Sequence, residues 1–204
     1  MDTHAMYLRR AAPEEARLVY ERDLVKAFPA MELRTWSEIE NLARRGKYEF
    51  LCLYDGADIV GTITLCPVRP GWIFWDYFCV TPSRRNAGLG EQMAKDLWQL
   101  YPDSVILMEV EAPEHAPNPA LAARRLGFYK RNGARQSGFE AELFGVRYHV
   151  IYWADVPIPD ADIQREYDDF CRDIFPPGEY ERYVRIPYRA LEDASTSISR
   201  ERTN

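Results

Sequence analysis

Hydrophobic and polar positions follow two different periods along the chain. Short runs rich in β-branched and aromatic residues predict strands, because side chains on a strand alternate between two faces. These runs lie at 6–10, 48–54, 59–66, 72–80, 105–111, 136–142 and 146–153. Apolar residues spaced by three or four predict helices from Pro13 to Phe28, from a Ser37–Glu40 capping box onward, at 88–100 and at 119–132. A hairpin followed by alternating strands and helices indicates a mixed α/β sheet layered with helices.

The domain organisation follows from a change in composition after Trp153. The 204 residues fit one domain of ordinary size, which we expect at 6–154. Residues 155–190 begin with a Pro-rich stretch, and we expect an extension with a short amphipathic helix inside 163–175. From Glu192 onward only Ala194 and Ile198 are apolar, so we expect a disordered tail at 191–204.

The charge and the apolar runs exclude several classes of partner. Lys and Arg total 26 against 32 Asp and Glu, a formal charge of −6. Such a protein is repelled by phosphate backbones, so we expect no nucleic-acid partner. No apolar run approaches the roughly 18 residues of a membrane span, and the first residues lack the pattern of a signal peptide. We therefore expect a cytoplasmic protein that does not bind membranes.

The cysteines and histidines show no spacing typical of a metal site. Three of the four cysteines lie in apolar runs and the fourth in a helical pattern: Cys52, Cys66, Cys79 and Cys171. None forms a C-x-x-C pair, and neither His115 nor His149 has a neighbouring histidine or cysteine. We expect reduced, buried thiols and no bound metal.

The stretch from Trp75 to Gly90, WDYFCVTPSRRNAGLG, has the features of a phosphate site. A strand ends at Val80, and a Gly-bearing turn then opens a helix, whose exposed amides and positive dipole end favour an anion. No lysine follows Gly90, which excludes a Walker loop, and Met93 replaces the third glycine of a dinucleotide fingerprint. Arg84 and Arg85 add positive charge to this turn.

The turn and a later helix together resemble the GNAT superfamily of acyl-CoA-dependent N-acetyltransferases. The turn reads R-x-x-G-x-G from Arg85 to Gly90, and the later helix has Tyr129 followed four residues on by Gly133. The order of hairpin, strand, turn, helix, strand and Tyr helix extends the resemblance over about 6–153. It implies a mostly antiparallel sheet of about seven strands flanked by helices, with acetyl-CoA as the acyl donor.

The resemblance also implies which residues hold the donor. Main-chain amides of the turn would bind the coenzyme A pyrophosphate, at Arg85, Asn86, Ala87, Gly88, Leu89 and Gly90. The backbone of Phe78, Cys79 and Val80 would pair with the pantetheine arm, and one of its N–H groups would polarise the thioester carbonyl. Two family positions differ: Ala122 stands where many members have Asn, and Ala134 where many have an aromatic residue.

Acetyl transfer to an amine requires a proton donor for the thiolate and a proton acceptor for the amine. By its place in the family pattern, Tyr129 is the candidate acid. Three alternatives for the base remain open: Asp76, one of the pair Glu109 and Glu111 at the end of a strand, or water with no protein base. Cys79 has no histidine beside it and is interpreted as a packing residue.

We therefore expect direct acetyl transfer from acetyl-CoA to a primary amine of a small molecule or peptide. The alternatives are a catalytically silent acyl-CoA-binding module and, less favoured, an unrelated α/β domain binding another phosphate ligand. The acceptor would contact the N-terminal helices, with Glu32 as a candidate for holding a cationic amine, and the extension after Trp153. A homodimer is compatible with the sequence, although no residue pattern indicates one.

Overall fold

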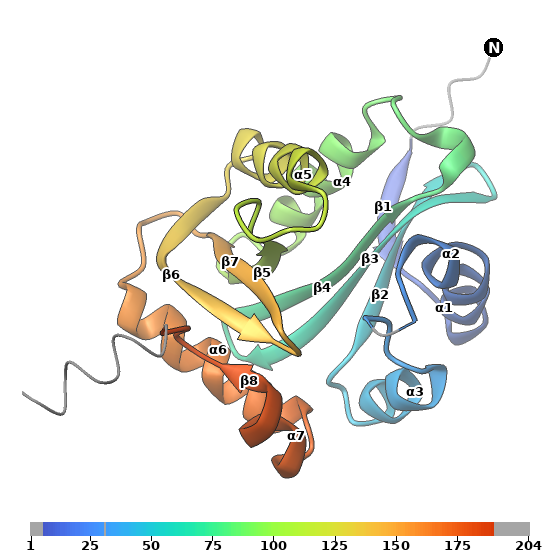
Figure 1. Ribbon diagram of the computed structural model, residues 1–204. Helices are drawn as coiled ribbons and strands as arrows, with labels where there is room; N and C mark the ends of the chain where they lie inside the picture. Colours follow the sequence, from blue (N-terminus) through green and yellow to red (C-terminus); the bar gives the residue numbers. More distant parts are fainter. Residues whose placement is uncertain (1–5, 31, 190–204) are drawn as a thin grey trace, which may run out of the picture. The chain divides into compact units, whose positions relative to one another are not determined.

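The computed structural model describes residues 6–30 and 32–189 (Figure 1). Its strands are β1 Tyr7–Arg10, β2 Glu49–Asp55, β3 Asp58–Arg69, β4 Trp72–Val80, β5 Val105–Glu111, β6 Arg135–Leu143, β7 Val146–Trp153 and β8 Val184–Arg185. Its helices are α1 Pro13–Val19, α2 Val25–Ala27, α3 Trp36–Arg44, α4 Leu89–Leu100, α5 Pro119–Arg131, α6 Asp160–Ile174 and α7 Pro177–Tyr183, with a π-helix, η1, at Tyr20–Leu24 and a 3-10 turn, η2, at Pro82–Arg84. The tail predicted at 191–204 lies outside the described residues.

All seven predicted strands are present, and β8 adds a short eighth. The strand order is β1-β2-β3-β4-β5-β7-β6-β8. The pairs β1–β2, β2–β3, β3–β4, β6–β7 and β6–β8 are antiparallel, whereas β4 and β5 run parallel. The predicted class, a mixed and mostly antiparallel sheet flanked by helices, is confirmed.

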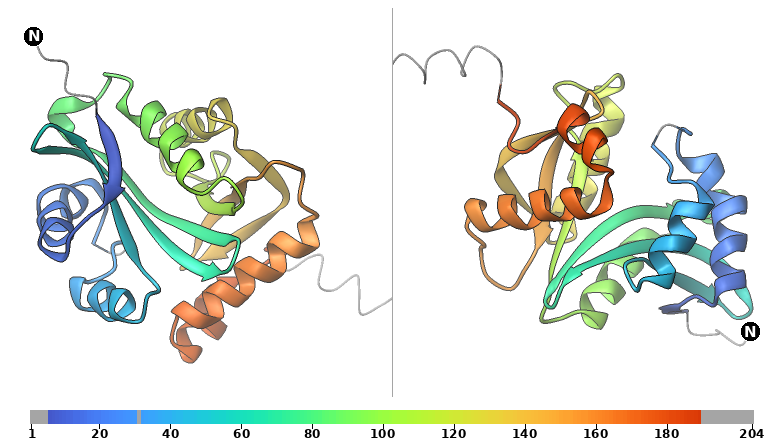
Figure 2. Two further views of the ribbon diagram at one scale, coloured as in Figure 1. Left: turned by 180° about the vertical axis from the view of Figure 1, so that it is seen from behind. Right: turned by 90° about the horizontal axis from the view of Figure 1, so that it is seen from below.

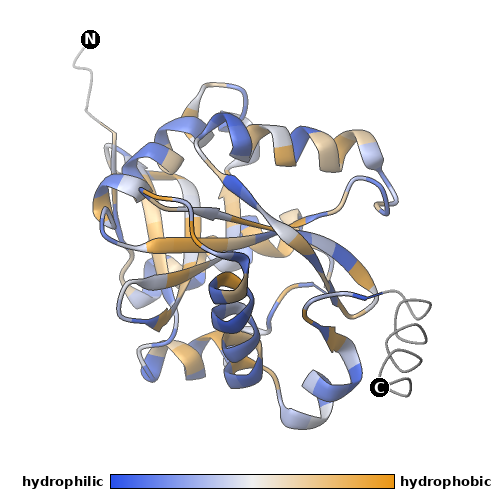
Figure 3. Cartoon of the chain, turned by 90° about the vertical axis from the view of Figure 1, so that its left-hand side faces the viewer, coloured by the Kyte–Doolittle hydropathy of each residue, from blue (hydrophilic) through white to orange (hydrophobic). Residues whose placement is uncertain are grey.

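The chain forms two compact units that divide between Met108 and Glu109. In the first unit, β1 to β4 carry α1 to α3 on one face and α4 on the other (Figure 2). Central residues of β2 and β3 are buried on both faces, which agrees with their unbroken apolar sequence. Colouring by hydropathy shows largely apolar strands and helices with one apolar and one polar side (Figure 3).

One helix start differs from the sequence prediction. The capping box of α3 is Thr35 with Glu38, not Ser37 with Glu40. The Glu38 carboxylate accepts a hydrogen bond of 2.7 Å from the Thr35 amide, and the Thr35 hydroxyl accepts one of 3.4 Å from the Glu38 amide. This pair satisfies two amides at the helix start, so the helix begins at Trp36.

In the second unit, β6 and β7 form a hairpin whose turn residues, Phe144 and Gly145, have left-handed φ values of 51° and 80°. These values suit the tight turn that joins two twisted strands. Helix α5 contacts β7 through a T-shaped pair of Tyr129 and Trp153, with ring centroids 5.9 Å apart. Helix α6 begins where the Asp160 carboxylate accepts a 3.0 Å hydrogen bond from an amide of β6.

All four cysteines are buried and free of disulfides. Burial raises the pKa of the Cys52 thiol to about 11 and also raises the pKa values of the Cys66 and Cys79 thiols. These thiols are protonated at neutral pH, as expected for packing residues. Among the described residues, no helix is both long and apolar enough to cross a bilayer.

Candidate active site

The turn between β4 and α4 has a conformation that exposes its main-chain amides. The 3-10 turn Pro82–Arg84 leads into Asn86 with φ of 64° and Gly88 with φ of 78°. Both residues are left-handed, a conformation that glycine adopts without strain and asparagine tolerates. Gly88 is the N-cap residue of α4, so the turn directs its last amides along the helix axis.

These amides are available to a ligand. Residues 85–88 are exposed, and in the part of the chain that the structure describes the amides of residues 86–90 make no hydrogen bond. The first amides of a helix have no intrahelical partner, and the helix dipole adds positive potential at the same end. The turn therefore has the geometry of an anion site.

The two arginines of the turn have different surroundings. Arg84 forms an ion pair with Asp55, the last residue of β2. Arg85 is exposed, and its Nε donates a 3.2 Å hydrogen bond to the Val80 carbonyl. The Asp55 pair partly neutralises Arg84, so Arg85 supplies the more accessible positive charge of the turn.

A buried polar group that the sequence analysis did not identify anchors the start of the turn. The Thr81 amide donates to the Val60 carbonyl at 3.0 Å, and the Thr81 hydroxyl donates to Asp23 at 3.1 Å. Asp23 is buried and paired with Arg22, whose guanidinium also donates to the Ile59 carbonyl. Asp23 is 58 residues from Thr81 in sequence, so no local motif could indicate this contact.

The end of β4 lies beyond its pairing with β5. The ladder between the two strands joins Trp72–Phe74 to Val105–Leu107. On its other edge, β4 pairs with β3 as far as Val80, across a register shift at residues 76–77. The Tyr77 amide donates there to the Thr64 hydroxyl at 2.8 Å. Bulges of this kind redirect a strand and occur often beside active sites. Phe78, Cys79 and Val80 follow this bulge.

Asp76 lies within the bulge, and its carboxylate contacts two neighbouring side chains. Its side chain is 11% exposed; the Tyr48 hydroxyl donates to it at 2.6 Å, and the Arg34 Nε lies 3.4 Å away. Burial, the largest single effect, acts to lower the pKa of Arg34, but the charge of Asp76 and the smaller effects of Cys66, Tyr48 and Tyr77 together outweigh it, and the net shift is upward. Burial, together with the same charge, raises the pKa of Tyr48. Asp76 therefore holds Arg34 and Tyr48 in place through these two contacts.

The other two candidate carboxylates lie on β5 in the second unit. Glu109 accepts a hydrogen bond from the buried Tyr167 hydroxyl of α6. Glu111 has a looser partner, with its Oε2 at 3.8 Å from Arg125 of α5. Of the two glutamates, Glu111 therefore has the weaker contact with a neighbouring side chain.

Tyr129 lies on the buried face of α5 and is 9% exposed. Its ring contacts Trp153 and, at 5.3 Å between centroids, Phe128. Burial raises the pKa of the Tyr129 phenol, and the smaller effect of Arg125 opposes this shift. The phenol therefore keeps its proton at neutral pH, as a proton donor must.

Comparisons with known proteins agree with this geometry. The model of the acetyltransferase (GNAT) family matches residues 12–128, more than half of the chain. The protein belongs to this family, and its predicted membership is confirmed. A comparison with curated proteins found no match.

Solved structures share the fold. A protein assigned to the GNAT family of acetyltransferases from Bacteroides thetaiotaomicron has a TM-score of 0.66 and 20% identity, over 80% of this chain and 93% of its own. A Bacillus subtilis acetyltransferase in complex with CoA has a TM-score of 0.56 and 14% identity, over 74% and 100%. The spermidine N-acetyltransferase of Vibrio cholerae, in complex with CoA and spermine, has a TM-score of 0.53 and 12% identity, over 72% and 94%. The chain is therefore a member of the acetyltransferase (GNAT) family that has the fold of these solved structures.

Proposed function

We propose that this acetyltransferase transfers an acetyl group from acetyl-CoA to a primary amine of a small molecule or peptide. In the reaction, the amine nitrogen attacks the thioester carbonyl carbon and the carbon–sulfur bond breaks. The amine loses one proton and the departing thiolate gains one. The observation that carries the proposal is that the amides of residues 86–90 make no hydrogen bond in the described part of the chain, on a turn whose residues 85–88 are exposed. Family membership favours a CoA-type ligand at such a turn.

The donor would be held by main-chain groups. The amides from Arg85 to Gly90 would bind the pyrophosphate, and the Arg85 guanidinium would add charge at the exposed side of the turn. The backbone of residues 78–80 would pair with the pantetheine arm and polarise the thioester carbonyl. The side chains at these strand positions would then contribute little to the reaction. The buried thiol of Cys79, whose pKa is raised by burial, agrees with a packing role.

Tyr129 would act as the general acid that protonates the thiolate. Its buried phenol holds its proton at neutral pH, which supports this role. Ala122 lacks the side-chain amide that many family members have at that position, so the pantetheine would depend more on main-chain contacts.

For the base, we infer that Glu111 is the best of the three predicted carboxylates. A base must have a carboxylate oxygen that an incoming amine can reach. Asp76 accepts a hydrogen bond from Tyr48 and pairs with Arg34, and Glu109 accepts one from Tyr167. Glu111 has a longer contact, with Arg125 at 3.8 Å, so its oxygens are less occupied by neighbouring groups.

Glu111→Gln is therefore expected to lower kcat by about 100-fold, the usual contribution of general-base catalysis. Asp76→Asn should instead lower the melting temperature, because it removes the partner of Arg34, with a smaller loss of kcat. Steady-state kinetics and thermal denaturation of both variants provide the test. A larger loss of kcat in Asp76→Asn, with stability unchanged, would transfer the role to Asp76.

The function itself is tested with acetyl-CoA and a panel of amines. Saturating acetyl-CoA, at about 100 times its Kd, should raise the melting temperature by about 5 °C through mass action on the folded state. A panel of polyamines, amino sugars and peptides with free amines should then contain at least one member that releases CoA thiol. A thermal shift without thiol release would indicate a silent acyl-CoA-binding module. Stabilisation by ADP but not by desulfo-CoA would indicate a different phosphate ligand and contradict the proposal.

A further inference from the structure

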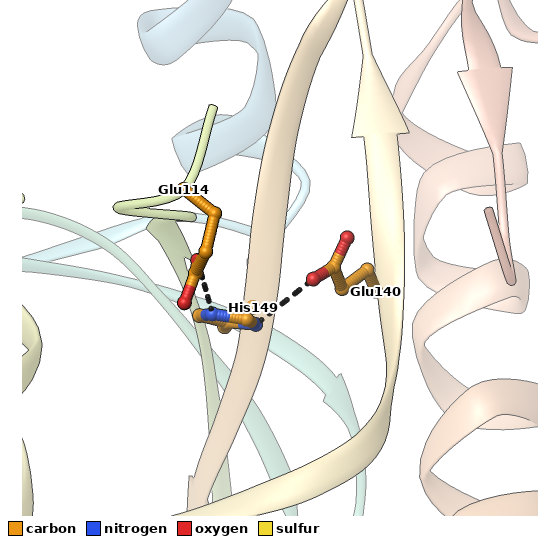
Figure 4. A group of neighbouring side chains, drawn as sticks. All are labelled: Glu114, Glu140 and His149. Carbon is orange, nitrogen blue, oxygen red and sulfur yellow. Dashed lines mark hydrogen bonds and ion pairs between the residues drawn. The ribbon is translucent and has the colours of Figure 1, made fainter. Parts of the chain in front are cut away.

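Three potential metal ligands meet in the second unit. Glu114 lies in the loop after β5, while Glu140 of β6 and His149 of β7 are direct cross-strand neighbours (Figure 4). One ligand atom from each residue lies within 4.8 Å of the other two. Sequence spacing does not reveal this group, because Glu114 is 35 residues from His149 and lies on a different element.

The imidazole of His149 lies between the two carboxylates. It is 8% exposed, with Nε2 at 3.1 Å from Glu114 and Nδ1 at 3.6 Å from Glu140. Nδ1 is buried and has no hydrogen-bond partner in the described part of the chain. Nδ1 and Oε1 of Glu140 therefore face each other at 3.6 Å without a hydrogen bond, and a positive charge placed between them would contact both.

Arg147 orients this group without supplying that charge at the imidazole. Its guanidinium donates through Nε to Oε2 of Glu140 at 2.9 Å and lies 3.8 Å from the centroid of the Tyr188 ring. This contact occupies one carboxylate oxygen and leaves the other, Oε1, toward His149. Residues that hold a ligand from behind in this way are typical of metal sites.

We propose that Glu114, Glu140 and His149 bind a divalent transition-metal ion of the zinc type. One imidazole nitrogen and two carboxylate oxygens suit such an ion, and water would complete the coordination. The 3.6 Å between Nδ1 and Oε1 of Glu140 is close to the roughly 3.4 Å that separates two tetrahedral ligands about 2.1 Å from one zinc, so the ion would bind at Nδ1. The Glu114 side chain is 62% exposed, so it can move inward with the ion and leaves a path from solvent.

Bound metal would join the loop after β5 to both strands of the β6–β7 hairpin. This proposal replaces the expectation from sequence spacing that the protein holds no metal. It does not depend on the proposed acetyl transfer, since none of the three residues belongs to the machinery assigned to that reaction.

Titration of the full-length, tag-free, chelator-treated protein with ZnCl2 and CoCl2 tests the proposal. We expect one ion per chain, a melting temperature raised by about 5 °C at 100 times the Kd, and affinity lowered at least 10-fold by His149→Gln or Glu140→Gln. Glu142→Gln, on the same strand as Glu140, and His115→Gln, beside Glu114, are the matched controls and should bind metal normally.

X-ray absorption of the zinc-loaded wild-type protein keeps the test independent of how the variants fold. The expected first shell contains nitrogen and oxygen but no sulfur. Failure to bind either metal at about 100 µM, far above the roughly sub-micromolar Kd values of structural zinc sites, would overturn the proposal. Binding that survives both His149→Gln and Glu140→Gln, or a shell with sulfur, would do the same.

Discussion

Valine in place of Gly88 is expected to remove coenzyme A binding while the protein remains folded. Gly88 has φ of 78°, and no atom lies within 4 Å of an added Cβ, so the effect is conformational rather than a clash. The left-handed conformation costs about 1–2 kcal/mol for an L-residue, and a β-branched residue is an outlier there. Valine would turn this residue out of that region and redirect the amides that follow it. We expect the Kd for CoA, measured by titration calorimetry, to rise about 100-fold, or about 2.7 kcal/mol.

Gly46→Val is a matched control for this prediction. Gly46 follows α3, has φ of 69° and also has no atom within 4 Å of an added Cβ. Its replacement should cost similar stability and leave CoA affinity unchanged. Gly88→Asn should retain most of the affinity, because asparagine tolerates the left-handed conformation. Equal losses of affinity in the two valine variants would mean that general destabilisation is the cause, against the assigned turn.

Tyr129→Phe should lower kcat by about 100-fold and leave the Kd for CoA within about two-fold of the wild-type value. Phenylalanine keeps the ring packed against Trp153 and removes only the proton that the thiolate would receive. The acid acts in its protonated form, and burial raises the pKa of the phenol. The pH profile of kcat should therefore show no alkaline loss due to Tyr129 below about pH 10, the ordinary tyrosine value.

Tyr152→Phe is the control for the loss of a buried hydroxyl in the same unit. The Tyr152 hydroxyl accepts a 3.3 Å hydrogen bond from the Ile158 amide, a contact outside the proposed chemistry. This variant should lose some stability and keep its kcat. If Tyr129→Phe instead weakens CoA binding at unchanged kcat, Tyr129 is a packing or binding residue and the acid must be sought elsewhere.

The sequence predicted the elements whose signals are local and strong. Strands β2, β3 and β4 are largely apolar runs bounded by turn residues, and in the structure they begin and end within a few residues of the predicted limits. Strand β8 has two residues, too few for any periodicity. The start of α3 was placed two residues too late because Thr35 and Ser37 each offer a capping hydroxyl with a glutamate three residues on, so the spacing does not distinguish them.

The same distinction applies to the candidate site. The turn from Arg85 to Gly90 is contiguous, so its glycines and its place before a helix could be read directly. The partners of Asp76 and Thr81 come from other elements, and no sequence spacing contains them. His149 is the clearest case, since the sequence showed an isolated histidine and the fold gives it two carboxylates.

Burial of the cysteines has a practical consequence for enzymology. Aromatic disulfide reagents, which develop colour on reaction with thiolates, should react slowly with the native protein, because Cys52, Cys66 and Cys79 are both inaccessible and protonated. Free CoA reacts at once with such reagents. A continuous colorimetric recording of turnover should therefore have a low and steady background, and a rising background would serve as an optical signal of unfolding.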